Sequence, residues 1–431
     1  AYMNRKRFSK QGYEDMQRWF HDNAMVRKIP AGESRSGLVF TQERPGSKGL
    51  NMTVIHRQTA QDFTFFVPMP GFVADFMQVD FANLYEPEEQ RELTILELRD
   101  VLEDELPCCS RDSTGEKSGG PFNAVLVGTG QAVRRAMLRG GWLETPADES
   151  VAVRARQQLY EGRRSDAIFS QRREDGGERV VLQLWMTPWR VRGEPAWVGI
   201  VYYYLDDDSP LSWFDAEIGK GTELFKHFTR ESLVADIDSA QRFLYQNLWY
   251  NGSLEKIGLV RGVGESSIEA PQTSFAGGTY FSKGFRMVAF LSEGLNALDE
   301  VVFLTDPSEF FPGGKPGELF QGRQVPPPND RLHIQRSGTL KIATAVPSRD
   351  EAQAIFDVDL YQKNIQPVWV QIENAGSSPL NLTPMGVDKA YFTPREAAHR
   401  SRKNPFEARA REYETRGHVA MAVPPHSIQS G

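Results

Sequence analysis

The sequence predicts an α+β or mixed α/β central domain flanked by small β-rich, sandwich-like modules. Three observations support this fold class. Between residues 121 and 305, short apolar segments typical of strands alternate with amphipathic helix patterns. The segments on either side carry β-branched and aromatic runs separated by turn residues. Residues 306–330 are rich in proline and glycine, which prevents a regular element and marks a linker.

Residues 1–35 are predicted to form a linker with a helical segment, and a β-rich leader module is expected over residues 36–86. Three runs in this module, SGLVF, LNMTVIH and DFTFFV, are typical of short strands. The turn-rich segment ERPGSKG separates the first two runs. Pro68, Pro70 and Gly71 end the strand pattern.

The central domain is predicted over residues 87–305. Apolar residues at a mixed spacing predict a helix over residues 87–106, which ends before Pro107 because proline cannot continue the helical hydrogen bonds. Two further helices are expected over Ala132–Leu138 and residues 233–249. The expected strands of this domain are PFNAVLVG, ERVVLQLWM, PAWVGIVYYYL, KIGLV, FRMVAFL and EVVFL.

Beyond the linker, a small β-rich module is predicted over residues 331–400. GTLKIATAV, QPVWVQIENAG and LNLTPMGV are typical of strands, and a short helix is expected over Glu351–Phe356. Residues 401–431 are predicted to form a second linker.

This second linker echoes residues 7–37 at an offset of 394 positions, so that Gly37 aligns with Gly431, each preceded by serine. Two interpretations stay open: two similar linkers of low complexity, or a tandem unit of about 394 residues. The tandem interpretation predicts that the gene product continues past Gly431 with a strand resembling LVFT.

The charge balance excludes some classes of partner. The chain has 431 residues, with 50 Lys+Arg and 57 Asp+Glu, and a net charge of −7 argues against nucleic acid as a partner. No apolar run has the roughly 18 residues that a membrane span needs, and the longest, Ala196–Leu205, suits a buried strand. Because the chain begins at Ala1 rather than Met, a preceding leader, lipid anchor or membrane anchor stays open.

The two cysteines, Cys108 and Cys109, are adjacent. Two thiols cannot form a disulfide scaffold or a cysteine-rich zinc site. Neighbouring side chains on a regular element point apart, so we expect reduced, packed thiols rather than a vicinal disulfide.

A few acidic residues are weak candidates for a hard-cation site, whose ligands are carboxylate oxygens. They are Asp206, Asp207, Asp208, Asp236 and Asp238. A solvated turn, and acids at a helix N-terminus that complement its dipole, explain the same residues without a metal. The sequence predicts no cofactor.

Aromatic residues form the densest local feature, and core packing is the first interpretation of them. They are Trp185, Trp189, Trp197, Tyr202, Tyr203 and Tyr204. Successive residues of a strand point to opposite faces, so we expect at least one of the three tyrosines to point away from the core. An exposed aromatic ring would suit a protein interface, which makes these six residues candidate partner-binding residues.

Seven segments follow one another in an order that matches a known family. They are LPCCSRDSTGEKSGGPFNAVLVG, GGW, GRRSDAIF, LWMTPWRVRGEPAWVG, DIDSAQRFLYQNL, GLVRGVG and TYFSKGFRMVAFLS. This series resembles the LssY C-terminal-like domain family of bacterial envelope proteins, whose activity is not established. The flanking β-rich segments resemble modules of the same proteins. The resemblance implies an extracytoplasmic location, periplasmic or at the cell surface, and lipoprotein-like relatives.

The chain departs from the family pattern at polar positions. The family usually carries His and Arg where Val181 and Gln183 stand, and Arg-Asp where Tyr203 and Tyr204 stand. We therefore expect a non-catalytic binding or structural module of a cell-envelope or complex-associated protein, which contacts other proteins as a subunit of a larger assembly. One alternative is a metal-assisted hydrolase or carbohydrate-active enzyme with an acidic site. The other is a small-molecule carrier with a cavity lined by Trp185 and Trp197.

Overall fold

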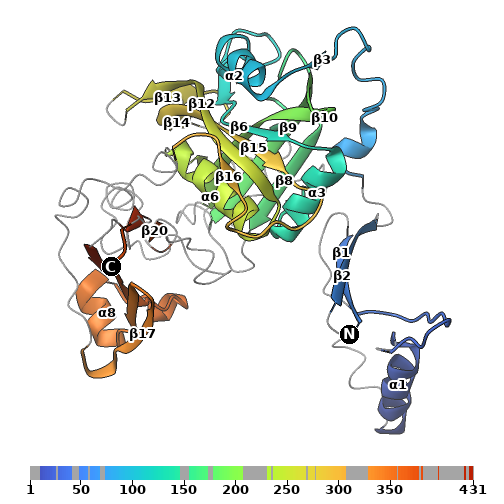
Figure 1. The fold of residues 1–431 in the computed structure, drawn as a ribbon, viewed down its shortest axis with the longest axis vertical. Coiled ribbons are helices and arrows are strands. Elements are labelled where there is room, and N and C mark those ends of the chain that lie inside the picture. The colour runs from blue at the N-terminus through green and yellow to red at the C-terminus, as the bar shows by residue number, and fades with distance from the viewer. Residues whose placement is uncertain are drawn as a thin grey trace, which may run out of the picture. The chain divides into compact units, whose positions relative to one another are not determined.

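The structure is a computed structural model of the chain with two compact units, Ala1–Pro45 and Gly46–Gly431. A large sheet with helices and several small separate sheets confirm the α+β class (Figure 1). The described residues are 10–25, 28–40, 48–56, 59–67, 73–145, 155–172, 178–206, 231–233, 236–267, 270–276, 278–306, 329–356, 358–377, 380–381, 397, 422–423 and 427–430. Among them, no helix has the length and apolar character needed to cross a bilayer.

The first unit contains one amphipathic helix, α1 (Lys10–Asn23), inside the segment predicted to be helical. After the helix the chain turns back on itself, and Ala24 forms a parallel bridge with Leu38. The amide of Leu38 donates to the carbonyl of Asn23 at 2.8 Å. The strand predicted for SGLVF, residues 36–40, is therefore limited to this single bridge.

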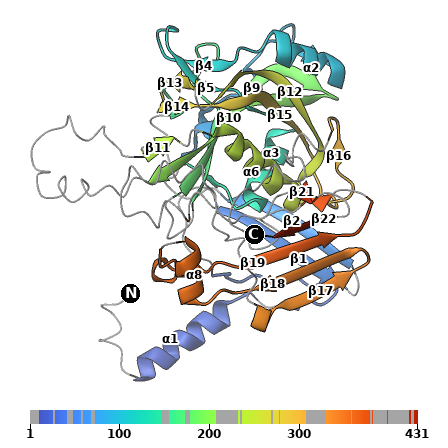
Figure 2. The same cartoon turned by 90° about the vertical axis from the view of Figure 1, so that its left-hand side faces the viewer.

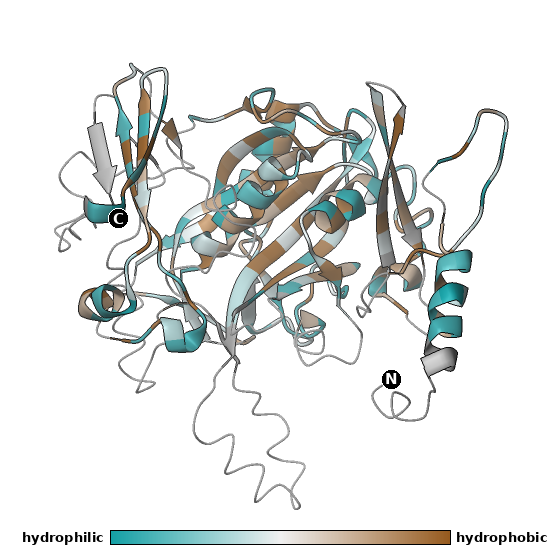
Figure 3. Cartoon of the chain, turned by 90° about the horizontal axis from the view of Figure 1, so that it is seen from below, coloured by the Kyte–Doolittle hydropathy of each residue, from teal (hydrophilic) through white to brown (hydrophobic). Residues whose placement is uncertain are grey.

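Strands of the central sheet carry many of the buried apolar residues of the second unit (Figure 3). Its strand order mixes parallel and antiparallel neighbours (Figure 2). The order is β16 (Val302–Phe303), β12 (Leu254–Ser266), β15 (Ser282–Leu291), β6 (Ala124–Val127), β10 (Glu194–Asp206), β9 (Glu178–Val191), β8 (Ala167–Arg172) and β7 (Leu143–Glu144), while β11 (Glu231–Leu233) pairs with β10 and β3 (Arg91–Glu92) with β9.

Helices cover both faces of this sheet. Apolar residues of α3 (Gly130–Arg139), and those of α6 (Ile237–Tyr250) from Ala240 onward, enter one core cluster. Those of α2 (Ile95–Asp104), together with Ile237, enter the cluster on the opposite face. Strands between two layers of helices are buried on both sides, which explains their nearly continuous apolar runs.

Two predicted helices begin later than expected, because a capping residue fixes each start. The helix predicted over residues 87–106 begins at Ile95, since Thr94 and Glu97 form a reciprocal capping box. The helix predicted from residue 233 begins at Ile237, since Asp236 accepts a hydrogen bond from a backbone amide of the first turn.

Small sheets form outside the central domain. The hairpin of β1 (Lys48–His56) and β2 (Thr59–Val67) is a two-stranded antiparallel sheet. A four-stranded antiparallel sheet contains β17 (His333–Ser337), β18 (Leu340–Ala345), β19 (Trp369–Asn374) and β22 (Ser427–Ser430), and α8 (Arg349–Phe356) follows β18 in the chain.

The remaining short elements are η1 (Asp75–Gln78), β4 (Cys109–Arg111), β5 (Ser118–Pro121), β13 (Gln272–Ser274), β14 (Gly278–Tyr280), η3 (Asn329–Arg331), η4 (Tyr361–Lys363), β20 (Leu380–Asn381) and β21 (Ala422–Val423).

Part of the predicted C-terminal linker belongs to a sheet, because β22 pairs with β19. Its four residues have too short a pattern to predict a strand on their own, and the partner strand supplies the hydrogen bonds. At the offset of 394 positions, β22 corresponds to residues 33–36, which form no strand in the first unit. Residues 404–417, the counterpart of α1, lie outside the described residues, so the tandem unit stays a prediction.

Candidate functional site

All six aromatic residues proposed to bind a partner are buried. Tyr202 and Tyr204 enter the core cluster on the α2 side of the sheet, and Tyr203 enters the cluster on the side of α3 and α6. The expectation that one ring would be exposed is wrong, because the sheet has a core on each face. Trp185 and Trp197 also lie in different clusters, so the two cannot line one cavity as the carrier hypothesis required.

The candidate acidic residues have structural partners where they are described. Asp236 caps α6 and contacts the Arg242 guanidinium at 2.9 Å. Asp238 is buried and accepts hydrogen bonds from Ser282 Oγ and the amide of Lys283, both at 2.8 Å. Burial raises the pKa of the Asp238 carboxyl.

The structure describes the side chains of only two of the five acids. Asp206 is the last residue of β10, opposite Glu231 in the register, while Asp207 and Asp208 lie outside the described residues. Within the described part of the chain, His, Cys, Asp and Glu form no group of three or more that could hold a metal ion. Asp236 at the N-cap of α6 and Asp238 in its first turn thus occupy the helix N-terminal positions that the metal-free interpretation predicted.

A second buried polar group lies in the segment GRRSDAIF. Asp166 accepts hydrogen bonds from Arg163 Nη1 at 2.8 Å and from the amide of Met186 at 2.7 Å. Arg163 also donates to the Met186 carbonyl at 2.9 Å and to Tyr85 Oη at 3.1 Å. Burial raises the pKa of Asp166 against the opposing effect of Arg163. This group joins the loop before β8 to β9.

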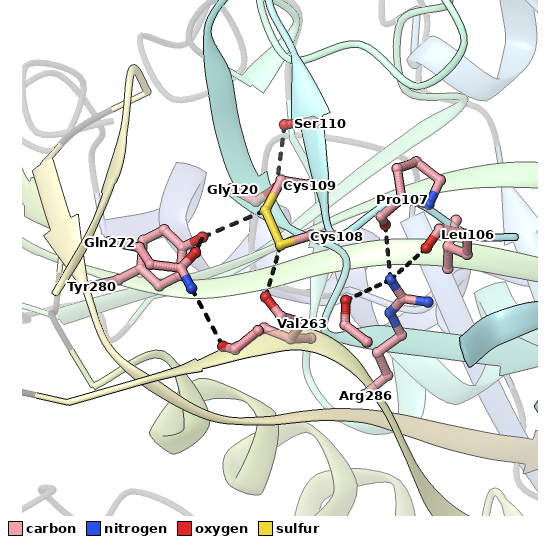
Figure 4. The surroundings of a disulfide bond; sticks show 12 residues. Leu106, Pro107, Cys108, Cys109, Ser110, Gly120, Val263, Gln272, Tyr280 and Arg286 are labelled. Atoms are coloured by element: carbon pink, nitrogen blue, oxygen red, sulfur yellow. Dashed lines mark hydrogen bonds between the residues drawn. A yellow bond between two sulfur atoms is a disulfide. The ribbon is translucent and has the colours of Figure 1, made fainter. Parts of the chain in front are cut away.

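The feature with its own chemistry is a disulfide between Cys108 and Cys109 (Figure 4). The expectation of reduced thiols is therefore wrong. That expectation assumed a regular element, whose neighbouring side chains point apart, but Cys108 lies in the irregular connection between α2 and β4. The two Cα atoms are 3.7 Å apart, and both side chains turn to the same side of the chain.

Arg286 of β15 holds the backbone that leads into the disulfide. Its side chain is fully buried, and its guanidinium donates to the carbonyls of Leu102, Leu106 and Pro107. These oxygens lie at the end of α2 and just beyond it, where helical carbonyls lack partners within the helix. Burial lowers the pKa of Arg286 to about 10, which leaves the side chain protonated at neutral pH.

Arg286 also donates to a fourth carbonyl, that of Gly262 in β12, at 2.9 Å. Gly262 has a φ of +130°, and a Cβ at this position would lie 2.8 Å from Arg286 Cζ. Glycine is thus required both for the backbone conformation and for the approach of the guanidinium. The register of β12 against β15 shifts between Arg261 and Gly264, so Val263 lies within a bulge.

The backbone after the disulfide is held from the β5 side. The amide of Phe122 donates to the carbonyl of Cys108 at 2.7 Å, and Cys109 pairs with Pro121 across β4 and β5. Cys109 is therefore paired within β4 and β5, and Cys108 is held by a backbone hydrogen bond from the residue just after β5.

Each sulfur atom has an oxygen beside it (Figure 4). Cys108 Sγ lies 2.7 Å from the carbonyl oxygen of Val263, and Cys109 Sγ lies 3.5 Å from Tyr280 Oη. The Tyr280 hydroxyl is also 2.8 Å from Gln272 Oε1, to which it donates. Burial raises the pKa of Tyr280 to about 12, so the phenol is neutral at physiological pH. Cys109 is buried, whereas Cys108 is half-buried.

Comparisons of the chain with protein-family models, curated proteins and solved structures gave no match. The disulfide and its surroundings therefore have to be interpreted from their geometry alone. Sequence reasoning missed Arg286, although one signal was present: FRMVAFL contains a single cation in an otherwise apolar strand.

Proposed function

We propose that the chain is a non-catalytic binding or structural module of a bacterial cell-envelope or complex-associated protein, located outside the cytoplasm, and that it acts through contacts with other proteins. The observation that carries this proposal is an exposed apolar face on the β1–β2 hairpin. The candidate aromatic residues of β9 and β10 cannot supply the contact surface, because they are buried.

Register places the apolar side chains of the hairpin on one face. Met52 lies opposite Phe63, and Val54, Phe65 and Val67 follow at steps of two along their strands. All five side chains are exposed, to between 39% and 53%. The rings of Phe63 and Phe65 are stacked with centroids 6.5 Å apart. We call these five residues the hairpin face.

A protein with an apolar sheet or strand surface is the partner that this face fits. A two-stranded hairpin is marginally stable in water without a further layer, and clustered exposed apolar side chains mark an interaction site. Phe65 is 44% exposed, which leaves about 90 Å² of its roughly 200 Å² still to be buried. At about 25 cal/mol per Å², covering it contributes about 2 kcal/mol to binding.

The test is an affinity comparison of two single variants of the full chain, Phe65→Ser and Leu96→Ser. Leu96 is an exposed apolar residue of α2 outside the hairpin face, and it serves as the matched control. The unaltered chain is crosslinked in an envelope extract of the source bacterium, and each captured protein is purified. Its dissociation constant is then measured with all three chains.

We expect Phe65→Ser to weaken binding about 30-fold, which corresponds to about 2 kcal/mol. Leu96→Ser is expected to bind like the unaltered chain. Equal affinities for all three chains, or the capture of no envelope protein, would contradict the proposal.

A further inference from the structure

We propose that Cys108 and Cys109 form a reversible two-electron redox site, which alternates between the disulfide and a dithiol by exchange with an external dithiol. The proposal is independent of the hairpin face. It rests on the contacts of the two sulfur atoms and on their different exposure. It also rests on the backbone frame, by which we mean the hydrogen bonds from Arg286 and the Phe122 amide to the backbone around the pair.

The surroundings of the sulfur atoms already contain hydrogen-bond acceptors for the S–H groups of the reduced pair. A disulfide carries no S–H proton, whereas a dithiol carries two that need acceptors when they are buried. The Val263 carbonyl lies within reach of Cys108 Sγ, and Tyr280 Oη lies within reach of Cys109 Sγ. Reduction therefore leaves neither new S–H group without a partner.

The backbone frame is independent of the bond between the sulfur atoms. Arg286 holds the carbonyls of Leu106 and Pro107 before the pair, and the Phe122 amide holds the carbonyl of Cys108. None of these hydrogen bonds involves sulfur. The frame can thus persist through oxidation and reduction, which makes exchange reversible without unfolding.

The difference in exposure between the two cysteines decides which sulfur atom is attacked. Cys108 is half-buried and Cys109 is buried, so an incoming thiolate reaches Cys108 Sγ first. Attack forms a mixed disulfide with Cys108, breaks the Cys108–Cys109 bond and sends its electron pair to Cys109 Sγ. The Tyr280 hydroxyl can rotate from Gln272 Oε1 to donate to this thiolate, which accepts a hydrogen bond more strongly than a neutral amide oxygen.

The second thiol of the reductant completes the reaction. It attacks the reductant's own sulfur in the mixed disulfide and releases Cys108 as a thiolate. The two protons given up by the reductant's thiols reach the two cysteines. The external dithiol is thereby oxidised to a disulfide, and the Cys108–Cys109 pair gains two electrons and two protons.

The first test counts free thiols in the folded full chain with iodoacetamide and mass spectrometry. We expect no adduct on the chain as purified without reductant, two adducts after dithiothreitol, and none after the dithiothreitol is removed and oxidised glutathione is added. Reduced chain is also expected to bind one equivalent of phenylarsine oxide, which bridges two neighbouring thiols. Adducts that persist after oxidised glutathione has been added, or reduction that requires urea, would overturn the redox site.

The second test compares Tyr280→Phe with Tyr245→Phe. Tyr245 is a buried tyrosine of α6 on the opposite face of the sheet, so it controls for the loss of a buried hydroxyl. We expect Tyr280→Phe to slow reduction by dithiothreitol about tenfold, because one hydrogen bond to the leaving thiolate is lost. Tyr245→Phe should leave the rate unchanged, and both chains should still show two adducts after full reduction. Equal rates for the two variants would refute the role of Tyr280.

Discussion

Replacing Arg286 by methionine is expected to destabilise the central domain strongly. Methionine has a similar length but donates no hydrogen bond, so the carbonyls of Leu102, Leu106, Pro107 and Gly262 all lose a charged donor. A net contribution of about 2 kcal/mol for each such bond would give about 8 kcal/mol. The removal of a buried charge returns several kcal/mol of desolvation cost, which leaves a loss of about 4 kcal/mol.

The assay is urea unfolding followed by tryptophan fluorescence, because Trp142, Trp185 and Trp197 are buried in the central domain and report on its packing. A loss of about 4 kcal/mol would lower the melting temperature of a domain of this size by about 10 °C. Arg99→Met on the exposed side of α2 is the control, and it should leave the unfolding curve unchanged. A loss below about 1 kcal/mol for Arg286→Met would refute the reasoning that these four carbonyls depend on the guanidinium.

Three further predictions concern single contacts. Gly262→Ala should cost about 2 kcal/mol more than Gly278→Ala in urea unfolding, since the two glycines have similar positive φ (+130° and +125°) but only the first faces Arg286; equal costs would exclude the steric contribution. Thr94→Ala should lower the free energy of unfolding by about 1 kcal/mol, because the α2 cap is lost. An unfolding curve identical to that of the unaltered chain would show that the cap is dispensable. Because burial raises the pKa of Asp238 above its ordinary 3.8, its protonated form favours the fold, so this contribution is complete below pH 3.8 and is lost as pH rises through the folded pKa. Asp238→Asn should remove that pH dependence from the unfolding free energy, and parallel pH profiles for variant and unaltered chain would contradict it.

Much of the sheet could be predicted from local sequence, because β9 and β10 have long apolar runs that suit strands buried on both faces. The start of α2 was missed although its signal was present: Thr94 and Glu97 have the spacing of a capping box. Polar residues before Thr94 were instead included in the helical pattern.

The candidate site could not be predicted in the same way. Whether Cys108 and Cys109 pair depends on the backbone between α2 and β4, and Arg286, far away in the sequence, holds that backbone. The exposure of the β10 tyrosines likewise depends on whether the second face of the sheet is covered, which is decided by α3 and α6. Neither the backbone conformation at the cysteines nor the cover on the second face of the sheet can be inferred from local sequence patterns.

The pairing of β6 with β15 has a consequence for the order of folding. These strands join Ala124 to Met287, two segments separated by most of the central domain. Such a distant pairing makes folding slow, since a long loop must close before its contacts form. Until Leu291 has been synthesised, one edge of β6 stays unpaired and both core clusters are incomplete. A fragment that ends before β15 is therefore expected to aggregate rather than fold, and the domain depends on protection of its apolar strands while the chain is being made.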